Sequence, residues 1–331
     1  MSLRILVTLP LTQDQLQEIQ DIAPGAKVTF FPQRNVNAFS HLALTKEHVQ
    51  DANIILGSVP VDFVRGSENL QWIQLNSAGA GGFTDPGVLG QGVPATNATG
   101  GYGLAISEHM LGMMLALMKR LHLFRDYQNQ ALWLDEGVMV QAVEDATVLT
   151  IGLGDIGGNF ARKCKALGAH TIGIRRTNAD KPDWLDEQYT LDALDTLLPR
   201  ADVVAMSLPD TAHTVGLMTR ERIALMKHSA YLLNVGRGSA IDTEALCDAL
   251  EQNAIAGAGL EVTDPEPLPP EHRLWREKNA LITPHVSGGY HMRQTQERIF
   301  RIAADNLRRF LAGQPLEHLL DPATGYAVPV L

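Results

Sequence analysis

The sequence predicts an α/β fold in two domains, each with helices packed on the faces of a parallel β-sheet. The chain has 331 residues, and at roughly 150 residues per domain this length suggests about two domains. Short β-branched runs alternate with helical stretches from the N-terminus, and a second such series begins at Ala146. This alternation is typical of parallel sheets. Hydrophobic residues make up 45% and charged residues 19%, which excludes disordered and collagen-like chains.

The first series contains four strand candidates and one clear helix. Thr12–Ile22 has helical apolar spacing, and Thr12 is a suitable N-cap. The β-branched and apolar runs that predict strands are Arg4–Leu9, Lys27–Phe31, Asn53–Leu56 and Trp72–Leu75. The last of these runs leads directly into the glycine-rich segment Ser77–Gly82. Parallel sheets place ligands at turns of this kind.

A long apolar helix is predicted over roughly Leu104–Gln130, after the glycine-containing joint Thr96–Gly103. Its apolar residues cover too much of the circumference for a one-sided surface helix. We interpret its stripe as buried core or a subunit interface rather than a cofactor site, and hypothesise a homodimer through this helix. The stripe consists of Met110, Met113, Met114, Leu117 and Met118.

A final helix is predicted at about Gln294–Leu311, beyond the second series. If it returns to the first domain, the chain crosses between the domains twice. The crossings would then lie near residues 97–104 and 284–294.

Several classes of protein are disfavoured by composition. The net charge of −10 and pI of about 5.5 argue against binding to a nucleic-acid backbone. No apolar run reaches the roughly 18 residues of a membrane helix, and the N-terminus lacks a cleavage-site pattern. The cysteines, Cys164 and Cys247, form no CxxC, while His285 and His291 lack metal-ligand spacing. We therefore expect a cytoplasmic protein without a metal, and without a nucleic-acid or membrane partner.

The strongest local motif is a glycine-rich loop between a strand and a helix. The strand candidate Ala146–Ile151 is followed by Gly152-Leu153-Gly154-Asp155-Ile156-Gly157, then by a helix and a strand at His170–Ile174. In this context GxGxxG predicts a dinucleotide site. Gly152 permits the tight turn, Gly154 the approach of a pyrophosphate, and Gly157 close helix–strand packing, while the helix N-terminus supplies amide donors.

The end of the second strand predicts which dinucleotide is bound. NAD sites usually place an acidic residue there, whereas this chain has Arg175-Arg176-Thr177 and no acid before Asp180. Two guanidinium groups suit a 2′-phosphate. We expect NADP(H) to be preferred, with NAD(H) possible if the arginines are only solvated surface residues.

Three later strand candidates are each followed by a residue that could bind a substrate or transfer a proton. Leu232–Gly238 carries Arg237, Ala256–Pro267 carries Glu266, and Leu281–Gly288 carries His285. Arginine can bind the carboxylate and carbonyl oxygen of a 2-oxo acid. Histidine can protonate the alkoxide that hydride transfer creates, and a glutamate beside it favours the imidazolium. Each residue taken alone has a structural alternative, but their shared placement at strand ends after a dinucleotide loop predicts a hydride-transfer site.

Nearly the whole chain resembles the D-2-hydroxyacid dehydrogenase family (D-isomer-specific, NAD(P)-dependent). The motifs SAGAGG, GLGDIGG, SLPDTAHTVGLM, LLNVGRG, DPEPLP and TPHVSG occur in the family's order and spacing. The resemblance implies two Rossmann-like domains with the active-site cleft between them. A flavodoxin-like substrate-binding domain would comprise residues 1–100 and 292–331. A doubly wound NAD(P)-binding domain, residues 101–291, would be inserted into it.

The resemblance also implies roles for individual residues. Arg237 would bind and polarise the substrate, His285 would be the acid/base, and Glu266 would support His285. The amides of Ala78 and Gly79 would hold the substrate carboxylate. Residues expected beside the adenosine are Ser207, Leu208 and Pro209, and those beside the nicotinamide half are Asn234, Val235, Gly236, Glu261, His285 and Gly288. The family often has Asp at position 261 and Asp or Asn at position 81, where this chain has Glu261 and Gly81.

The substrate is expected to be a small 2-oxo acid, with glyoxylate and hydroxypyruvate favoured. The loop that would meet a substrate phosphate, Gly57–Val61, is followed by no Lys or Arg before Arg65, so a phosphate there would be poorly compensated. Formate-dehydrogenase relatives have glutamine at the position of Glu266, so the glutamate argues against formate as the substrate. The alternatives are a phosphoglycerate dehydrogenase-like enzyme and a dinucleotide-sensing corepressor-like binding module. The complete set of Arg237, Glu266 and His285 favours an enzyme over a sensor.

Overall fold

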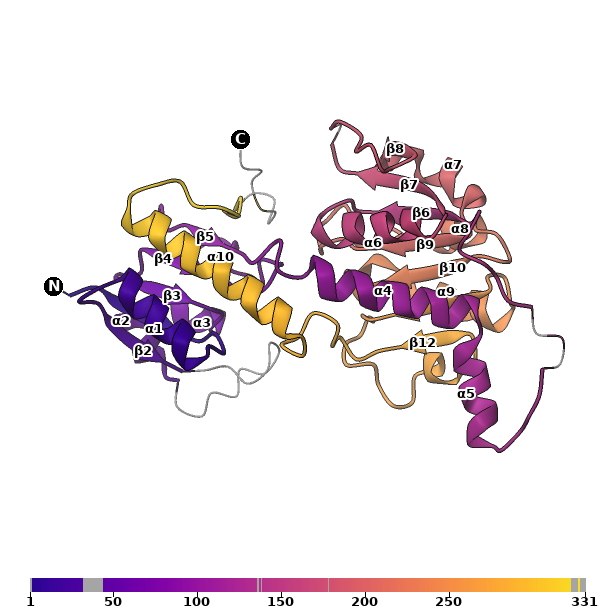
Figure 1. Cartoon of the computed structure of the whole chain (residues 1–331), viewed down its shortest axis with the longest axis horizontal. Helices are drawn as coiled ribbons and strands as arrows, with labels where there is room; N and C mark the ends of the chain where they lie inside the picture. The colour runs from indigo at the N-terminus through magenta and orange to yellow at the C-terminus, as the bar shows by residue number, and fades with distance from the viewer. Residues whose placement is uncertain are drawn as a thin grey trace. The chain divides into compact units, whose positions relative to one another are not determined.

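The chain divides into two compact units, which are described separately (Figure 1). The computed structural model describes residues 2–31, 44–135, 137, 139–177, 179–322 and 327. Unit 1 comprises Met1–Tyr102 and Gly289–Leu331, and unit 2 comprises Gly103–Gly288. Among the described residues, no helix is both long enough and apolar enough to cross a membrane.

Unit 1 contains a five-stranded parallel sheet in the order β2-β1-β3-β4-β5, which is the flavodoxin-like order. Its strands are β1 (Arg4–Val7), β2 (Lys27–Phe30), β3 (Ile54–Leu56), β4 (Trp72–Gln74) and β5 (Ala95–Thr96). Its helices are α1 (Gln13–Ile22), α2 (Lys46–Asp51), α3 (Val61–Val64) and α10 (Arg293–Leu311). The four predicted strands and the helix beginning after Thr12 are confirmed, whereas the short strand β5 was not anticipated.

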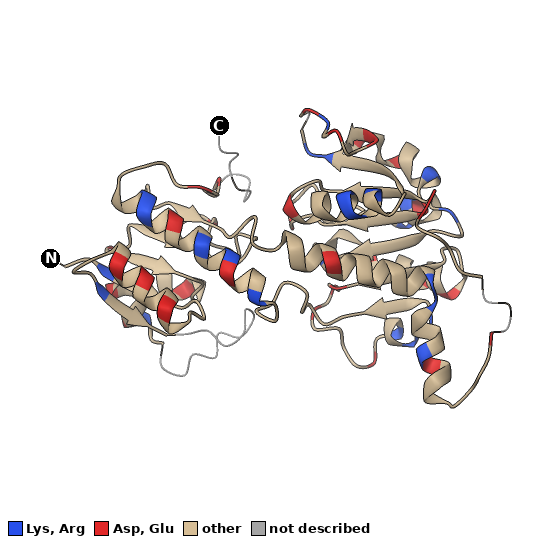
Figure 2. Ribbon diagram, in the orientation of Figure 1, with Lys and Arg blue, Asp and Glu red and all other residues tan. Residues whose placement is uncertain are grey.

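Helices α1 and α10 lie side by side in unit 1 (Figure 1). Thr12 caps α1, because its hydroxyl accepts a hydrogen bond from the Gln15 amide while the Gln15 side chain bonds back to Thr12. Basic residues of α10 meet an acidic residue of α1 (Figure 2): Glu18 pairs with Arg301 at 3.0 Å and with Arg308 at 2.6 Å. The final helix therefore packs within unit 1.

Unit 2 contains a seven-stranded parallel sheet in the order β12-β11-β10-β9-β6-β7-β8. Its strands are β6 (Thr147–Ile151), β7 (His170–Arg175), β8 (Glu187–Thr190), β9 (Val203–Met206), β10 (Tyr231–Asn234), β11 (Gly257–Leu260) and β12 (Ala280–Ile282). The strand order reverses between β6 and β9, as in doubly wound dinucleotide-binding folds. Ligands of such sheets bind outside the carboxyl ends of the strands at this reversal.

Helical segments connect the strands of unit 2. The α-helices are α4 (Gly103–Met118), α5 (Leu121–Asn129), α6 (Asp155–Ala166), α7 (Leu194–Leu197), α8 (Arg220–Ala224) and α9 (Thr243–Glu251). Short 3₁₀ turns are η1 (Leu191–Ala193), η2 (Leu198–Arg200), η3 (Gly238–Ala240) and η4 (Arg273–Arg276).

The prediction of one helix over Leu104–Gln130 is wrong, because the chain turns between α4 and α5. Arg120 adopts the left-handed conformation, with φ of 55°, and its amide closes the end of α4 by donating to the Leu117 carbonyl. Its guanidinium lies over the Tyr231 ring and donates to the Ala256 carbonyl at 3.4 Å. The sequence has neither glycine nor proline at this break. The left-handed conformation of Arg120 occurs together with its contacts to Tyr231 and Ala256.

The apolar stripe of α4 is core, which confirms the first of its two interpretations. All five of its members are at most 3% exposed: Met110, Met113, Met114, Leu117 and Met118. The helix packs against α6 and strands β10 and β11. These side chains are therefore not available to a second chain. The opposite face of α4 is also apolar, and its Leu111 and Leu115 are partly exposed.

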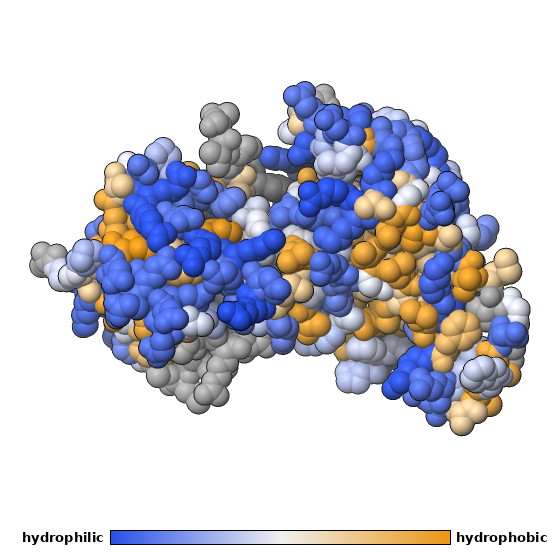
Figure 3. Space-filling view, in the orientation of Figure 1, coloured by the Kyte–Doolittle hydropathy of each residue, from blue (hydrophilic) through white to orange (hydrophobic). Residues whose placement is uncertain are grey.

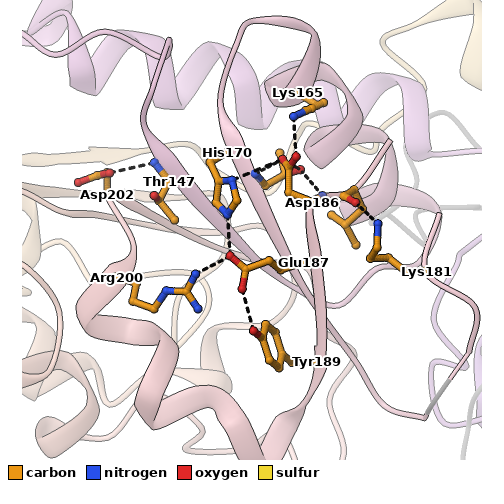
Figure 4. A network of polar contacts seen from close by, with 11 residues as sticks. Thr147, Lys165, His170, Lys181, Asp186, Glu187, Tyr189, Arg200 and Asp202 are labelled. Atoms are coloured by element: carbon orange, nitrogen blue, oxygen red, sulfur yellow. Dashed lines mark hydrogen bonds and ion pairs between the residues drawn. The ribbon is translucent and has the colours of Figure 1, made fainter. Parts of the chain in front are cut away.

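A polar network stabilises the amino-terminal edge of this sheet, opposite the carboxyl ends (Figure 4). His170 at the start of β7 lies 2.6 Å from Glu187 at the start of β8. Hydrogen bonds from Arg200, His170 and Tyr189 lower the pKa of Glu187 to about 2. Slight burial raises the pKa of the adjacent Asp186, but hydrogen bonds from Lys165 and Thr171 outweigh it and lower that pKa to about 2. The network fastens the edge strand β8 to the sheet.

Candidate active site

The glycine-rich loop at the end of β6 has the geometry of a phosphate-binding turn. Gly152 has φ of 96°, and a Cβ on Gly157 would lie 1.9 Å from the Gly152 carbonyl oxygen, so both positions require glycine. Gly154 is the N-cap of α6, and a Cβ there would meet nothing within 4 Å. The first helical bond runs from the Gly158 amide to the Gly154 carbonyl. The amides before it, including that of Ile156, lie at the helix N-terminus, where donors face an anion.

Both carboxylate oxygens of Asp155 accept hydrogen bonds from other residues of the chain. Its Oδ2 accepts a hydrogen bond from the Gly103 amide at 2.7 Å, at the start of α4. Its Oδ1 accepts a longer bond from Asn159 at 3.2 Å. Asp155 therefore caps α4 with its carboxylate, while its backbone lies in the glycine-rich loop.

The residues expected beside the adenosine follow β9, the strand across the reversal from β6. The Ser207 hydroxyl donates to the Gly152 carbonyl at 2.9 Å, which fastens this segment to the glycine-rich loop. Leu208 and Pro209 follow and are partly buried. A Cβ on Gly236 would lie 2.4 Å from the Leu208 carbonyl oxygen, so the segment also packs tightly against the end of β10.

The arginine pair expected to bind the 2′-phosphate lies at the end of β7, on the same carboxyl edge of the sheet. Arg175 is the last residue of β7 and is partly buried. Arg176 and Thr177 follow it and are exposed. Guanidinium groups at this edge are suited to binding a phosphate in a bidentate manner.

A buried asparagine shapes the turn that carries Arg237. Asn234 ends β10 and is fully buried; its side chain accepts from the Gly236 amide at 2.9 Å and donates to the Arg237 carbonyl at 2.8 Å. Val235 lies between them and is buried. A Cβ on Gly238 would lie 2.0 Å from the backbone of Thr263. The turn is thus fixed by the Asn234 side chain and by its close packing against Thr263, while the Arg237 side chain is exposed.

His285 and Glu266 form a direct pair. His285 Nδ1 lies 2.6 Å from Glu266 Oε1. A carboxylate only accepts hydrogen bonds, so we assign the proton of this bond to Nδ1, which leaves Nε2 as the ring atom for substrate. His285 has φ of 50°, a conformation that is uncommon outside glycine and often found at functional sites.

Glu261 is buried beneath the loop that carries His285. Its side chain is 1% exposed. Oε1 accepts from the Ser287 amide at 2.5 Å, and Oε2 accepts from the Thr283 hydroxyl and lies 3.3 Å from His109 Nε2. Burial raises the pKa of Glu261, but the hydrogen bonds from His109, Thr283 and Ser287 outweigh it and lower that pKa to about 2. Both carboxylate oxygens, expected to face a nicotinamide, are therefore engaged within the protein.

His109 was missed by the sequence reasoning. It lies on α4, and the chain separation of 174 residues from Thr283 gives no local signal of the contact. Gly288 is the last residue of unit 2 and follows the same loop.

In unit 1, the loop after β4 turns its carbonyls toward its own chain. The Ser77 carbonyl accepts from the Ala98 amide, the Ala78 carbonyl from Asn97 Nδ2 at 2.6 Å, and the Gly79 carbonyl from the Ser77 hydroxyl at 2.7 Å. Within the part of the chain that the structure describes, the amides of Ala78 and Gly79 donate no hydrogen bond. Two amides left in this way suit a carboxylate. Gly81 has φ of 57°, a left-handed conformation that glycine adopts without steric cost.

Arg237, Glu266 and His285 follow β10, β11 and β12, which are neighbours in one sheet. The shared carboxyl edge also carries the glycine-rich loop after β6 and the arginine pair after β7. The structure joins His285 to Glu266 directly. It therefore combines a dinucleotide-type loop with a histidine–carboxylate pair at one edge of unit 2.

Comparison with known proteins gives a consistent result. Residues 111–287 match the family model described as "D-isomer specific 2-hydroxyacid dehydrogenase, NAD binding domain". The chain is 33% identical to an uncharacterised protein of Corynebacterium melassecola, over 85% of this chain and 92% of that one. It is 29% identical to a glyoxylate reductase of Thermofilum pendens, over 79% and 78% of the two chains.

Solved structures agree with the sequence comparison. A D-isomer specific 2-hydroxyacid dehydrogenase family protein of Aeromonas salmonicida has a TM-score of 0.80 and 29% identity, covering 97% of this chain and 100% of that one. A D-isomer specific 2-hydroxyacid dehydrogenase of Xanthobacter autotrophicus, solved with NADPH and MES, has a TM-score of 0.80 and 26% identity. That match covers 98% of this chain and 100% of the other.

Proposed function

Since this chain belongs to the D-isomer specific 2-hydroxyacid dehydrogenase family, we propose that it reduces small 2-oxo acids to D-2-hydroxy acids with NADPH. Glyoxylate and hydroxypyruvate are the proposed substrates. The observation that carries the proposal is the His285–Glu266 pair, 2.6 Å apart, on the sheet edge that also bears the glycine-rich loop. The glyoxylate reductase of Thermofilum pendens, a relative over most of the chain, supports the choice of substrate.

The loop and the arginine pair fit the proposed cofactor. Gly154 leaves open space at the loop tip, beside the amide donors of α6, which suits a pyrophosphate. Arg175 and Arg176 at the end of β7 would bind the 2′-phosphate. The Xanthobacter autotrophicus structure was solved with NADPH, which supports this preference, and NADH remains a weaker alternative.

The chain's own residues perform the acid–base part of the proposed reaction. A nicotinamide held by unit 2 would supply hydride for the carbonyl carbon of the substrate. Arg237 binds the substrate carboxylate and polarises its carbonyl oxygen. His285 Nε2 then donates its proton to that oxygen, while Glu266 orients the ring from Nδ1 and stabilises its positive charge. The amides of Ala78 and Gly79 are the proposed additional donors to the substrate carboxylate.

The absence of a nearby cation disfavours a phosphorylated substrate. Residues 57–64, all of which the structure describes, contain no Lys or Arg. Arg65 follows α3 and donates to the Gly87 carbonyl at 3.3 Å. A phosphate beside residues 57–61 would therefore lack a charged partner in that segment.

We assign the dinucleotide to unit 2 and the substrate-binding domain to unit 1, and propose a homodimer in a reducing, cytoplasmic compartment. Both cysteines are free and buried. Hydrophobic side chains gather on the surface of unit 2 over α4 (Figure 3), and beyond it Leu121 and Trp133 are 55% and 102% exposed. Exposed apolar surface of this kind marks interaction sites, and a second copy of this chain is the proposed partner. Light scattering that gives a monomer at micromolar concentration would contradict the dimer.

The reaction is tested by following absorbance at 340 nm with NADPH or NADH and a panel of acids. The panel contains glyoxylate, hydroxypyruvate, phosphohydroxypyruvate and larger 2-oxo acids. We expect faster oxidation of NADPH than of NADH, with the two small unphosphorylated acids as the best substrates. A clear preference for phosphohydroxypyruvate would favour the phosphoglycerate dehydrogenase-like alternative. Dinucleotide binding without turnover of any acid would favour the sensing module.

A further inference from the structure

Helix α4 carries a histidine that reaches the segment holding His285. His109 is one-quarter exposed, and its Nε2 lies 3.0 Å from the Thr283 hydroxyl and 3.3 Å from Glu261 Oε2. Because the Thr283 hydroxyl donates to Glu261, it accepts from His109, so Nε2 carries a proton. His109, Thr283 and Glu261 thus form one continuous set of hydrogen bonds beneath the loop.

Glu261 holds the chain on both sides of His285. Its backbone carbonyl accepts from the His285 amide at 3.0 Å. Its carboxylate accepts from Thr283 before His285 and from the Ser287 amide after it. The left-handed conformation of His285 costs free energy and persists only where the surrounding structure holds the backbone in place. Glu261 supplies those constraints.

His109 completes the environment that keeps Glu261 in place. A carboxylate that is only 1% exposed needs strong donors, because burial penalises an ionised group. Of the donors that the described structure gives to Glu261, only His109 can carry a positive charge.

We propose that His109 is a positioning residue for His285, acting through the Glu261 carboxylate. This inference rests on the proposed reductase function, in which His285 transfers the proton. Removing the Nε2–H donor of His109 leaves a buried carboxylate with one donor fewer and leaves the Thr283 hydroxyl without its donor. The loop then relaxes, and His285 loses its alignment with the substrate.

A double-mutant cycle tests whether His109 acts through His285. His109→Phe should lower kcat by about tenfold to a hundredfold, the range expected for a misplaced catalytic group, while the dissociation constant of NADPH changes less than about twofold. His109→Gln, which retains an N–H donor, should recover most of the activity. In the His285→Ala background, His109→Phe should have little further effect. His122→Phe on α5 is the matched control, because the His122 ring bonds the Ala116 carbonyl.

An equal loss of activity in the presence and absence of His285 would overturn the proposal. So would a rise in the NADPH dissociation constant that accounts for the whole loss, since Glu261 would then act on the cofactor. If His109→Phe does not fold, His109→Gln and His109→Asn replace it. Retention of activity by Gln and its loss in Asn then support the proposal, and equal activity in both contradicts it.

Hydrogen–deuterium exchange gives a readout that does not depend on turnover. In His109→Phe, the peptide covering residues 283–288 should exchange at least about tenfold faster than in wild type, because the Ser287 amide loses its fixed acceptor. The peptide should be unchanged in His122→Phe. Unchanged exchange in His109→Phe would overturn the structural step. Absence of wild-type turnover with normal exchange behaviour would instead refute the proposed function.

Discussion

Three glycines of the dinucleotide loop differ in their surroundings, and alanine substitutions should separate their roles. A Cβ on Gly157 would lie 1.9 Å from the Gly152 carbonyl oxygen and 2.6 Å from Ser207 Oγ. The backbone oxygen cannot rotate away as a side chain would. A Cβ on Gly158 would meet only the Leu153 carbonyl oxygen at 3.8 Å, and one on Gly154 would meet nothing within 4 Å.

These distances set the expected magnitudes. Gly157→Ala should lower the free energy of unfolding by about 1–3 kcal/mol, the usual cost of forcing an extra group into packed structure. Gly158→Ala should be neutral or raise it by up to about 1 kcal/mol, because alanine is the better helix former. Gly154 has φ of −78° and ψ of −159°, which alanine adopts without strain. Gly154→Ala should therefore leave stability unchanged.

Binding of NADPH should follow a different order. The methyl group of Gly154→Ala enters the open space proposed for the pyrophosphate, so the dissociation constant should rise at least about tenfold, or about 1.4 kcal/mol. Urea denaturation measures the free energy of unfolding, and quenching of protein fluorescence measures NADPH binding. Equal stability of Gly157→Ala and Gly158→Ala would refute the packing argument. Wild-type affinity in Gly154→Ala would show that the pyrophosphate does not lie on this loop.

Three further predictions address the proton donor, the cofactor phosphate and acid stability. His285→Ala should lower kcat by on the order of 10²–10⁴-fold, and a near-normal rate in steady-state assays would reject its role as acid/base. Arg175→Ala combined with Arg176→Ala should raise KM for NADPH much more than for NADH, and equal increases would show that the pair does not read the 2′-phosphate. The pKa values of Asp186 and Glu187 are lowered from 3.8 and 4.5 to about 2, so both carboxylates favour folding above those ordinary values. Their contribution should be lost as pH falls from about 4.5 towards 2, and denaturation of Glu187→Gln should show a weaker dependence on pH across that window than wild type.

The glycine-rich loop could be predicted from sequence because its requirements are local. The left-handed Gly152 and the crowded Gly157 are only five positions apart. This spacing indicates a tight turn that is followed at once by the first turn of a helix. The strands on either side of the loop could also be predicted, because a parallel strand buried on both faces is a continuous run of apolar residues. The sequence reasoning therefore identified the strand, the loop and the helix together.

The break after α4 could not be predicted in the same way. Apolar periodicity continues beyond Met118, and no glycine or proline interrupts it. The left-handed Arg120 is accompanied by contacts with Ala256 and Tyr231, which lie far along the chain. Tertiary contacts override local helix propensity, and residues so distant in sequence cannot be identified from the local pattern.

Helix α4 contacts both functional loops of unit 2, the glycine-rich loop and the loop that carries His285. Sequence interpretation identified neither contact. The first residue of α4, Gly103, donates its amide to Asp155 of the glycine-rich loop, and a Cβ there would lie 2.1 Å from Asp155 Oδ1. Less than two turns later, His109 Nε2 lies 3.3 Å from Glu261 Oε2, beneath the His285 loop. An Asp in a GxGxxG motif suggests a cofactor contact, and a histidine in an apolar helix suggests a core residue, when each is judged from its neighbours in sequence. In the folded chain one helix supplies a hydrogen-bond donor to each loop, so the geometry of the loops depends on α4 as well as on their own residues.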